Sequence, residues 1–208
     1  VGGAPLCAWE KKPYAAETPF VRPKTAVKDL ALAVLAHPDV ANKDWAYEQY
    51  DRDVQLRSVS LCHDAAVLRL EDKALVLSCG CNPRHIYLRP FEGTANAVIE
   101  NASNLACLGA DPLCIVDCLN FASPEHPEVF WQLEQCVLGL GDAARRMAIP
   151  IVGGNVSLYN ESDEFGTQIK PTPSLGMAGR GEVREWVPPA EGELLALIGK
   201  TLPDFGGS

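Results

Sequence analysis

The sequence contains no apolar run that approaches the roughly 18 residues of a membrane-spanning helix, and its first residues do not form a signal peptide. Basic residues are also scarce, because 18 Lys and Arg stand against 27 Asp and Glu and give a formal net charge of −9. Nucleic acids and anionic membranes are bound through basic surfaces, so neither is expected as a partner. We therefore expect a cytoplasmic protein and, because the sequence starts with Val1, a fragment or a processed chain.

Two common catalytic patterns are absent as well. No lysine follows the glycine pair Gly153-Gly154 in the way that a phosphate-binding P-loop requires. The four histidines form neither a pair at helical spacing nor a recognisable catalytic triad. The composition is that of an ordinary globular protein, 47% hydrophobic and 22% charged, and 208 residues suffice for one sizeable core.

The eight cysteines are more than usual, and they have two possible roles. Cys79 and Cys81 could form a zinc site with Cys62 and His63, but zinc ligands usually come in pairs spaced by about two to four residues, and no second such pair occurs. Alternatively, free thiols act as small hydrophobic side chains within apolar stretches, as at Cys107, Cys114, Cys118 and Cys136. We expect reduced, buried cysteines.

The hydrophobic pattern divides the chain into three unequal parts. Residues 1–23 are rich in proline without a sustained period, which indicates a surface segment or the tail of a preceding domain. Residues 24–183 have the alternation of helical and strand periods that predicts an α/β (α+β) domain. Residues 184–208 resemble the start of a truncated following domain, with a strand at 194–198.

Periodicity and turn residues predict the elements of the main domain. A helix at 25–36, ended by His37-Pro38, and a short helix at 45–49, capped by Asn42, come first. The later elements are a hairpin of strands 65–70 and 73–79, a helix at 94–108 with Thr94 as N-cap, a strand at 113–119, a helix at 127–147 and a strand at 149–152. The helix at 94–108 is expected to bury a stripe that includes Val98, Ile99, Ala102, Leu105 and Ala106.

Two strand ends contain residues that could bind a ligand. Asp117 interrupts an apolar strand, where an ionised carboxylate is costly unless something pairs with it. It either binds a ligand, or it caps the following turn or accepts backbone hydrogen bonds. After the next strand, Gly153-Gly154 allows close approach of a phosphate, Asn155 offers an oxygen that suits Mg²⁺, and Ser157 projects to the same side as Asn155 in an extended segment. An ordinary bulge or turn would use the same residue types. Glu48, Asp51 and Asp64 are weaker candidates.

Four strings identify a family at this point. Glu48-Gln49-Tyr50-Asp51, Asp117-Cys118-Leu119-Asn120-Phe121, Gly154-Asn155-Val156-Ser157-Leu158-Tyr159-Asn160 and Pro171-Thr172-Pro173 occur in this order in the family that the sequence resembles, phosphoribosylformylglycinamidine synthase, synthetase subunit. The resemblance covers about residues 40–180. It implies a fold similar to the N-terminal domain of aminoimidazole ribonucleotide synthetase, a mixed sheet flanked by helices. Of the two tandem units in this family, the chain resembles the second.

The resemblance implies a function. The family is an ATP-dependent ligase that converts formylglycinamide ribonucleotide, ATP and glutamine to formylglycinamidine ribonucleotide, ADP, phosphate and glutamate, with Mg²⁺ as cofactor. By position, Asp117 and Gly154 match ATP-contacting residues, Asn155 a magnesium ligand and Ser157 a substrate-binding residue. No catalytic residue is expected in this chain, because the family's catalytic histidine lies in the first unit. The implied partners are the remaining synthetase domains, a glutaminase subunit or domain, and a small accessory subunit.

The sequence departs from the family at Arg89, at Ser103 and at Ala122-Ser123, which puts full activity in question. The resemblance predicts that Asp117 and the Gly-Asn-Ser turn converge on a single nucleotide pocket. A non-catalytic nucleotide-binding or assembly module of the same fold is the alternative function.

Overall fold

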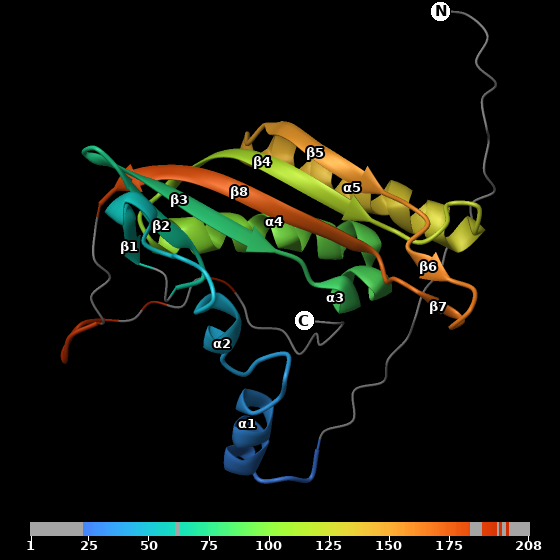
Figure 1. The fold of residues 1–208 in the computed structure, drawn as a ribbon, viewed down its shortest axis with the longest axis horizontal. Coiled ribbons are helices and arrows are strands. Elements are labelled where there is room, and N and C mark those ends of the chain that lie inside the picture. Colours follow the sequence, from blue (N-terminus) through green and yellow to red (C-terminus); the bar gives the residue numbers. More distant parts are fainter. Residues whose placement is uncertain (1–22, 61–62, 184–188, 195, 197–198, 200–208) are drawn as a thin grey trace, which may run out of the picture.

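The computed structural model describes residues 23–60, 63–183, 189–194, 196 and 199 (Figure 1). The segment 1–22 and most of the strand expected at 194–198 lie outside the described residues, and so does Cys62 of the alternative zinc site. Within the described part, the elements run from α1 to β8. No helix in that part of the chain is long and apolar enough to cross a membrane.

Six strands form one mixed sheet in the order β1-β2-β3-β8-β4-β5. The strands are β1 (Ser58–Ser60), β2 (Ala66–Leu70), β3 (Lys73–Gly80), β4 (Asp111–Asn120), β5 (Ile151–Ser157) and β8 (Thr172–Glu182). Only β4 and β5 pair in parallel, and the other neighbours are antiparallel. Because β5 stands last in this order, it is an edge strand. Its one neighbour in this order is β4, the strand that carries Asp117.

Two long helices cover one face of this sheet, α4 (Pro90–Cys107) and α5 (Pro127–Met147) (Figure 1). The main core fills the space between them and the sheet, with fully buried side chains such as Val76, Leu105, Ile115 and Leu175. A second cluster lies around Ile86, Leu119 and Phe121. The strands alternate, so that buried residues face the helices while their neighbours face the other way.

The beginning of α4 corrects one expectation. The helix starts at Pro90, where a proline suits the first turn, and Arg89 is its N-cap. Thr94 is therefore not an N-cap but a fully buried residue, and its hydroxyl donates to the Pro90 carbonyl oxygen at 2.7 Å. The expected inward stripe was also partly wrong, because Ile99 and Ala106 are exposed while Asn101 is buried.

Most other expected elements are confirmed with small shifts, but the strand expected at 149–152 is β5, which spans Ile151–Ser157. The hairpin β2–β3 turns at Glu71-Asp72, and α5 has the predicted bounds. The first helix is α1 (Val27–Leu35), which buries no residue, and the second is α2 (Asp44–Tyr47). Asn42 stands one residue before the N-cap of α2 and accepts a hydrogen bond from the Asp44 amide at 2.6 Å. The smaller elements are η1 (Val54–Leu56), α3 (Pro83–Leu88), β6 (Glu161–Ser162) and β7 (Thr167–Gln168).

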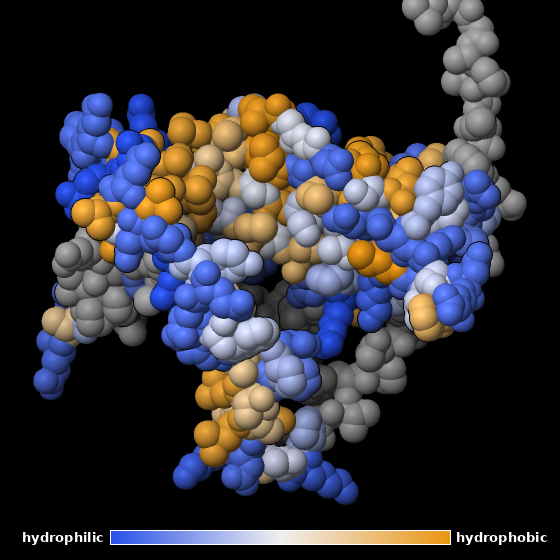
Figure 2. Space-filling model, in the orientation of Figure 1, coloured by the Kyte–Doolittle hydropathy of each residue, from blue (hydrophilic) through white to orange (hydrophobic). Residues whose placement is uncertain are grey.

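The sheet face that α4 and α5 leave open carries exposed apolar side chains. Leu77 and Val116 alternate along their strands with buried residues, so they point away from the helices. Exposed Cys79 and Cys118 share this face. Figure 2 shows hydrophobic residues gathered over the strands in this view. An apolar sheet face that faces solvent usually marks a surface that another domain or partner covers.

Candidate functional site

Asp117 and Gly154 lie side by side on neighbouring parallel strands, where the register pairs them directly. The carboxyl group of Asp117 packs against Gly154 and occupies the space that a Cβ atom there would need, with Oδ2 2.6 Å from that position. Both residues face the helix-covered side, because Asp117 stands two residues along its strand from buried Ile115 and from buried Leu119. Partial burial there raises the pKa of the Asp117 carboxyl group above its ordinary value.

Asn155 and Ser157 form a second pair. The Asn155 Nδ2 donates to Ser157 Oγ at 3.0 Å, so both side chains project to the same side, as expected from their spacing. Asn155 pairs in register with Cys118 and therefore faces the open side of the sheet. This hydrogen bond uses the amide nitrogen of Asn155 and leaves its carbonyl oxygen for another partner.

The structure thus joins Asp117 to Gly154 and Asn155 to Ser157, but it places the two pairs on opposite faces of the sheet. The expectation of one shared pocket is not met within this chain. The expected turn is also corrected, because the glycine–asparagine–serine segment belongs to β5 itself. Since β5 is an edge strand, the two faces meet along its free edge, and a ligand that contacts both pairs has to lie across that edge.

The loop after β5 is held by a residue that the sequence analysis did not single out. Asn160 Nδ2 donates to the carbonyl oxygens of Phe121 at 3.0 Å and Ser157 at 2.9 Å, and so it ties the ends of β4 and β5 together. Tyr159, just before it, has a left-handed backbone with φ of 61°. An asparagine next to a turn was the sequence signal for this role, since its side-chain amide can donate to two backbone carbonyl oxygens.

The residues on the open face fit part of a magnesium site. The carbonyl oxygen of Asn155 is a hard ligand of the kind Mg²⁺ accepts, but Mg²⁺ in proteins is usually held by one or two carboxylates as well. Asp117 lies on the other face, and the residues that the structure describes contain no group of three or more His, Cys, Asp and Glu that could hold a metal ion. The described residues could therefore offer Mg²⁺ one ligand on this face, and carboxylates would have to come from elsewhere.

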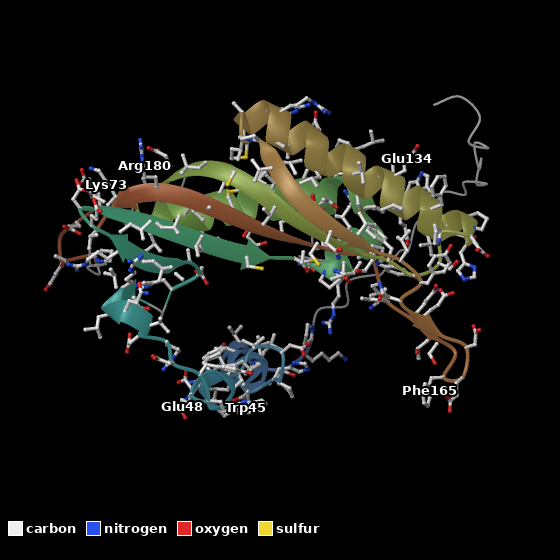
Figure 3. All side chains as sticks on the ribbon, turned by 45° about the horizontal axis from the view of Figure 1, so that its top comes forward. Trp45, Glu48, Lys73, Glu134, Phe165 and Arg180 are labelled. Carbon is white, nitrogen blue, oxygen red and sulfur yellow. The ribbon has the colours of Figure 1, made fainter. Side chains whose placement is uncertain are left out.

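The weaker candidates are not near these strand ends. Glu48 lies at the end of α2, and Figure 3 shows it with Trp45 on the α1–α2 segment, apart from the sheet. Asp51 is exposed and accepts from the Asp53 amide at 2.9 Å, which is an ordinary turn contact. Asp64 is exposed before β2. None of these joins the two pairs on β4 and β5.

The described cysteines are free thiols, but most are not buried as expected. Only Cys136 is fully buried, while Cys79, Cys107 and Cys118 are exposed. Burial raises the pKa of the Cys136 thiol to about 12 and that of Cys81 to about 11. The expectation that the cysteines are buried was wrong at Cys118, because its apolar strand has one face open to solvent.

The departures from the family pattern have clear places in the fold. Ala122 and Ser123 are buried directly after β4, and the Ser123 amide donates to Glu161 Oε2 at 3.0 Å. Ser103 is exposed on α4, where its hydroxyl donates to the Ile99 carbonyl oxygen at 2.8 Å. Arg89 is the N-cap of α4.

Comparison with known proteins connects this arrangement to one family. Residues 62–181 match the family described as AIR synthase related protein, N-terminal domain. Over its whole length the chain is 51% identical to phosphoribosylformylglycinamidine synthase subunit PurL of Methanosarcina barkeri. Over 99% of its length it is 46% identical to the subunit of the same name from Methanopyrus kandleri. The chain spans about 30% of the length of these curated relatives.

Solved structures give the same result. T. maritima PurL complexed with ATP is similar with a TM-score of 0.61 and 26% identity, over 83% of this chain and 27% of that one. The PurLQS structure from Thermotoga maritima is similar with a TM-score of 0.65 and 27% identity, over 83% of this chain and 28% of that one. The six-stranded mixed sheet flanked by helices is thus the fold of the corresponding part of these structures.

Proposed function

Because the chain belongs to the family of AIR synthase related proteins, as their N-terminal domain, we propose that it is one part of a phosphoribosylformylglycinamidine synthase. In the proposed reaction, formylglycinamide ribonucleotide, ATP and ammonia from glutamine give formylglycinamidine ribonucleotide, ADP and phosphate. The observation that carries the proposal is the 51% identity to a PurL subunit over the full length of the chain. T. maritima PurL has also been solved with ATP and with FGAR.

The β4–β5 edge gives each candidate residue a role. The Asp117–Gly154 pair would contact ATP, and Gly154 leaves room for the Asp117 carboxylate. Asn155 would bind Mg²⁺ through its free carbonyl oxygen, while Ser157 would contact the ribonucleotide on the same face. When bound, Mg²⁺ offsets the charge on the phosphoryl group that is transferred. The chain's own residues hold and orient the ligands, and none acts as the catalytic acid or base.

The open apolar sheet face is the proposed surface for the remaining domains of the synthetase. Leu77 and Val116 are exposed on it, and Asn155 and Ser157 lie at its β5 edge. A domain that covered this face would bury the apolar side chains and bring its own carboxylates to Asn155. The chain therefore supplies half of a site that forms at a domain interface.

The domain boundaries, the partner subunits and the location belong to the same proposal. Residues 24–183 would form the ATP–Mg²⁺ domain, preceded by the tail of another domain and followed by the start of the next at 184–208. The PurLQS structure shows that a relative belongs to a multi-component complex. A glutaminase and a small accessory subunit are the partners that we propose for this enzyme. The proposed location is the cytoplasm, where its small-molecule substrates are expected.

Reconstitution tests the proposal. The chain is mixed with the missing synthetase domains and an ammonia source, and ADP formation is measured with and without formylglycinamide ribonucleotide. We expect ADP formation that depends on this substrate, and loss of roughly 10- to 100-fold in activity with Asn155→Ala, as for other metal-site changes. Asn96→Ala, at an exposed position of α4, is the matched control and leaves the activity unchanged.

Two results would contradict the proposal. One is an unimpaired Asn155→Ala enzyme, which would remove the magnesium role. The other is tight ATP–Mg²⁺ binding by the chain alone, with an affinity that the missing domains do not change. That second result would favour the non-catalytic nucleotide-binding module instead. A module that binds ATP–Mg²⁺ alone would need more magnesium ligands than the one that the described residues offer on the open face.

A further inference from the structure

A cavity of about 410 Å³ lies between the start of α5 and the segment that leads into β8. Figure 1 shows α3, β7 and the first turns of α5 gathered at this end of the molecule. The volume falls within the range of small-molecule sites. The cavity is separate from the β4–β5 pairs, because Asp117, Gly154, Asn155 and Ser157 are not among its lining residues.

Gln132 is a polar residue that lines this cavity and whose side chain lacks a hydrogen-bond partner among the described residues. Its residue surface is only 4% exposed, yet no hydrogen bond of its side-chain amide is found within the described part of the chain. Every fully inaccessible side-chain nitrogen or oxygen in that part has a partner, so the Gln132 amide retains access to the cavity that it lines. An accessible amide without a protein partner is available to donate to a ligand in the cavity.

Lys170 and the first turn of α5 give the cavity two features that suit an anion. The Lys170 ammonium lies 5.7 Å from the centre of the Tyr87 ring, and among the described residues it forms no ion pair. The Val129 amide lies in the first turn of α5, where amides lack an intrahelical acceptor, and the N-cap His126 makes no side-chain cap bond. His126 Nε2 instead lies 3.5 Å from Glu161 Oε2. The one carboxylate that lines the cavity, Glu128, opposes an anion.

We propose that this cavity binds the phosphate group of a small phosphorylated molecule. Lys170, the Val129 amide and the Gln132 amide would donate to the phosphate oxygens. The volume exceeds what a phosphate ion fills, and the Tyr87 ring, Ile169 and Pro171 provide an apolar wall for the rest of the molecule. The proposal does not rest on the function proposed above, since it uses none of the residues of the β4–β5 edge.

Calorimetric titration of the 208-residue chain with inorganic phosphate and with ribose 5-phosphate tests the site. We expect saturable binding, weakened about tenfold or more by Lys170→Gln and by Gln132→Leu, because each removes a donor to a charged group. Gln135→Leu on the same helix and Lys73→Gln at the far end of β3 are the matched controls. They leave the affinity unchanged. Lys170 is exposed, so its variant reports on binding even if Gln132→Leu fails to fold.

Two further variants locate the bound phosphate on the chain. Glu128→Gln is expected to strengthen phosphate binding several-fold, because it removes the opposing charge from the cavity. Asn155→Ala is expected to leave it unchanged, because Asn155 lies outside the cavity. Weaker binding in either variant would overturn the proposal.

The two probes distinguish the ligands that could supply the phosphate group. Tighter binding of ribose 5-phosphate than of inorganic phosphate would show that the apolar wall is used, and equal affinities would identify free phosphate as the ligand. No saturable binding of either probe up to roughly 10 mM, about 3 kcal/mol of affinity, would overturn the proposal.

Discussion

The Asp117 carboxyl group occupies the space next to Gly154 that any larger residue's Cβ would fill. Gly154→Ala is therefore expected to destabilise the fold by about 1–3 kcal/mol, the usual cost of overpacking. At Gly153 nothing lies within 4 Å of an added Cβ, so Gly153→Ala is the matched control and has little effect on stability. Chemical denaturation of both variants measures the difference.

A double-mutant cycle tests whether Gly154→Ala destabilises the fold because its Cβ meets the Asp117 carboxyl group. In an Asp117→Ala background the space beside Gly154 is empty, so Gly154→Ala should no longer destabilise the fold. The contact assignment is wrong if the two substitutions are simply additive.

The stability of the protein should depend on the charge of Asp117. Burial raises the pKa of this carboxyl group in the folded state, so the folded protein binds the proton more tightly than the unfolded chain. The stabilisation by the protonated form is complete below the ordinary carboxyl pKa and is lost as the pH rises through the raised value. Asp117→Asn should therefore raise the melting temperature at pH 7 relative to wild type. The gain should shrink towards acidic pH, and a gain that does not vary with pH contradicts this account.

Asn160 should be important for stability although it is not proposed to bind a ligand. Its side chain donates to the carbonyl oxygens of Phe121 and Ser157. Asn160→Ala removes both hydrogen bonds, so we expect a loss of about 1–3 kcal/mol in the free energy of unfolding. Asn96→Ala, on the exposed side of α4, should change it by less than about 0.5 kcal/mol. Similar losses in both variants would argue against a tie between the ends of β4 and β5.

The open sheet face should be required for assembly rather than for folding. Val116 is 47% exposed there, so Val116→Asp should leave the secondary structure of the isolated chain intact. Binding to the remaining synthetase domains should become weaker by at least about tenfold, because a charge would be buried at the interface. Ile99→Asp, at an equally exposed position on α4, is the control. Equal loss of binding in both variants would place the interface elsewhere. Analytical ultracentrifugation of mixtures measures the association.

The cysteines should differ sharply in reactivity. Only the thiolate is alkylated efficiently, and the pKa values of about 11 for Cys81 and about 12 for Cys136 keep both protonated near pH 8. Iodoacetamide should therefore modify exposed Cys79, Cys107 and Cys118 first, as peptide mapping by mass spectrometry will show. Cys136 should react only after unfolding. Early modification of Cys136 in the folded protein would contradict its burial.

The sequence alone determined the elements whose signals are local. The bounds of α5 follow from Pro127 at its start and a helical apolar period, and the β2–β3 hairpin follows from two apolar runs around Glu71-Asp72. The strings around Asp117 and Gly154 also pointed to the two strands that now lie together. Each of these signals is contained in a short segment and does not depend on distant residues.

The tertiary structure decided what depends on distant partners. Thr94 has the residue type of an N-cap, but the chain starts the helix at Pro90 and buries Thr94 in it. The register between β4 and β5 pairs Asp117 with Gly154 and Cys118 with Asn155, which sends Asp117 and Asn155 to opposite faces. Alternation along one strand gives the side of each residue relative to its neighbours, whereas register between strands is set only when they pair and the helices cover one face.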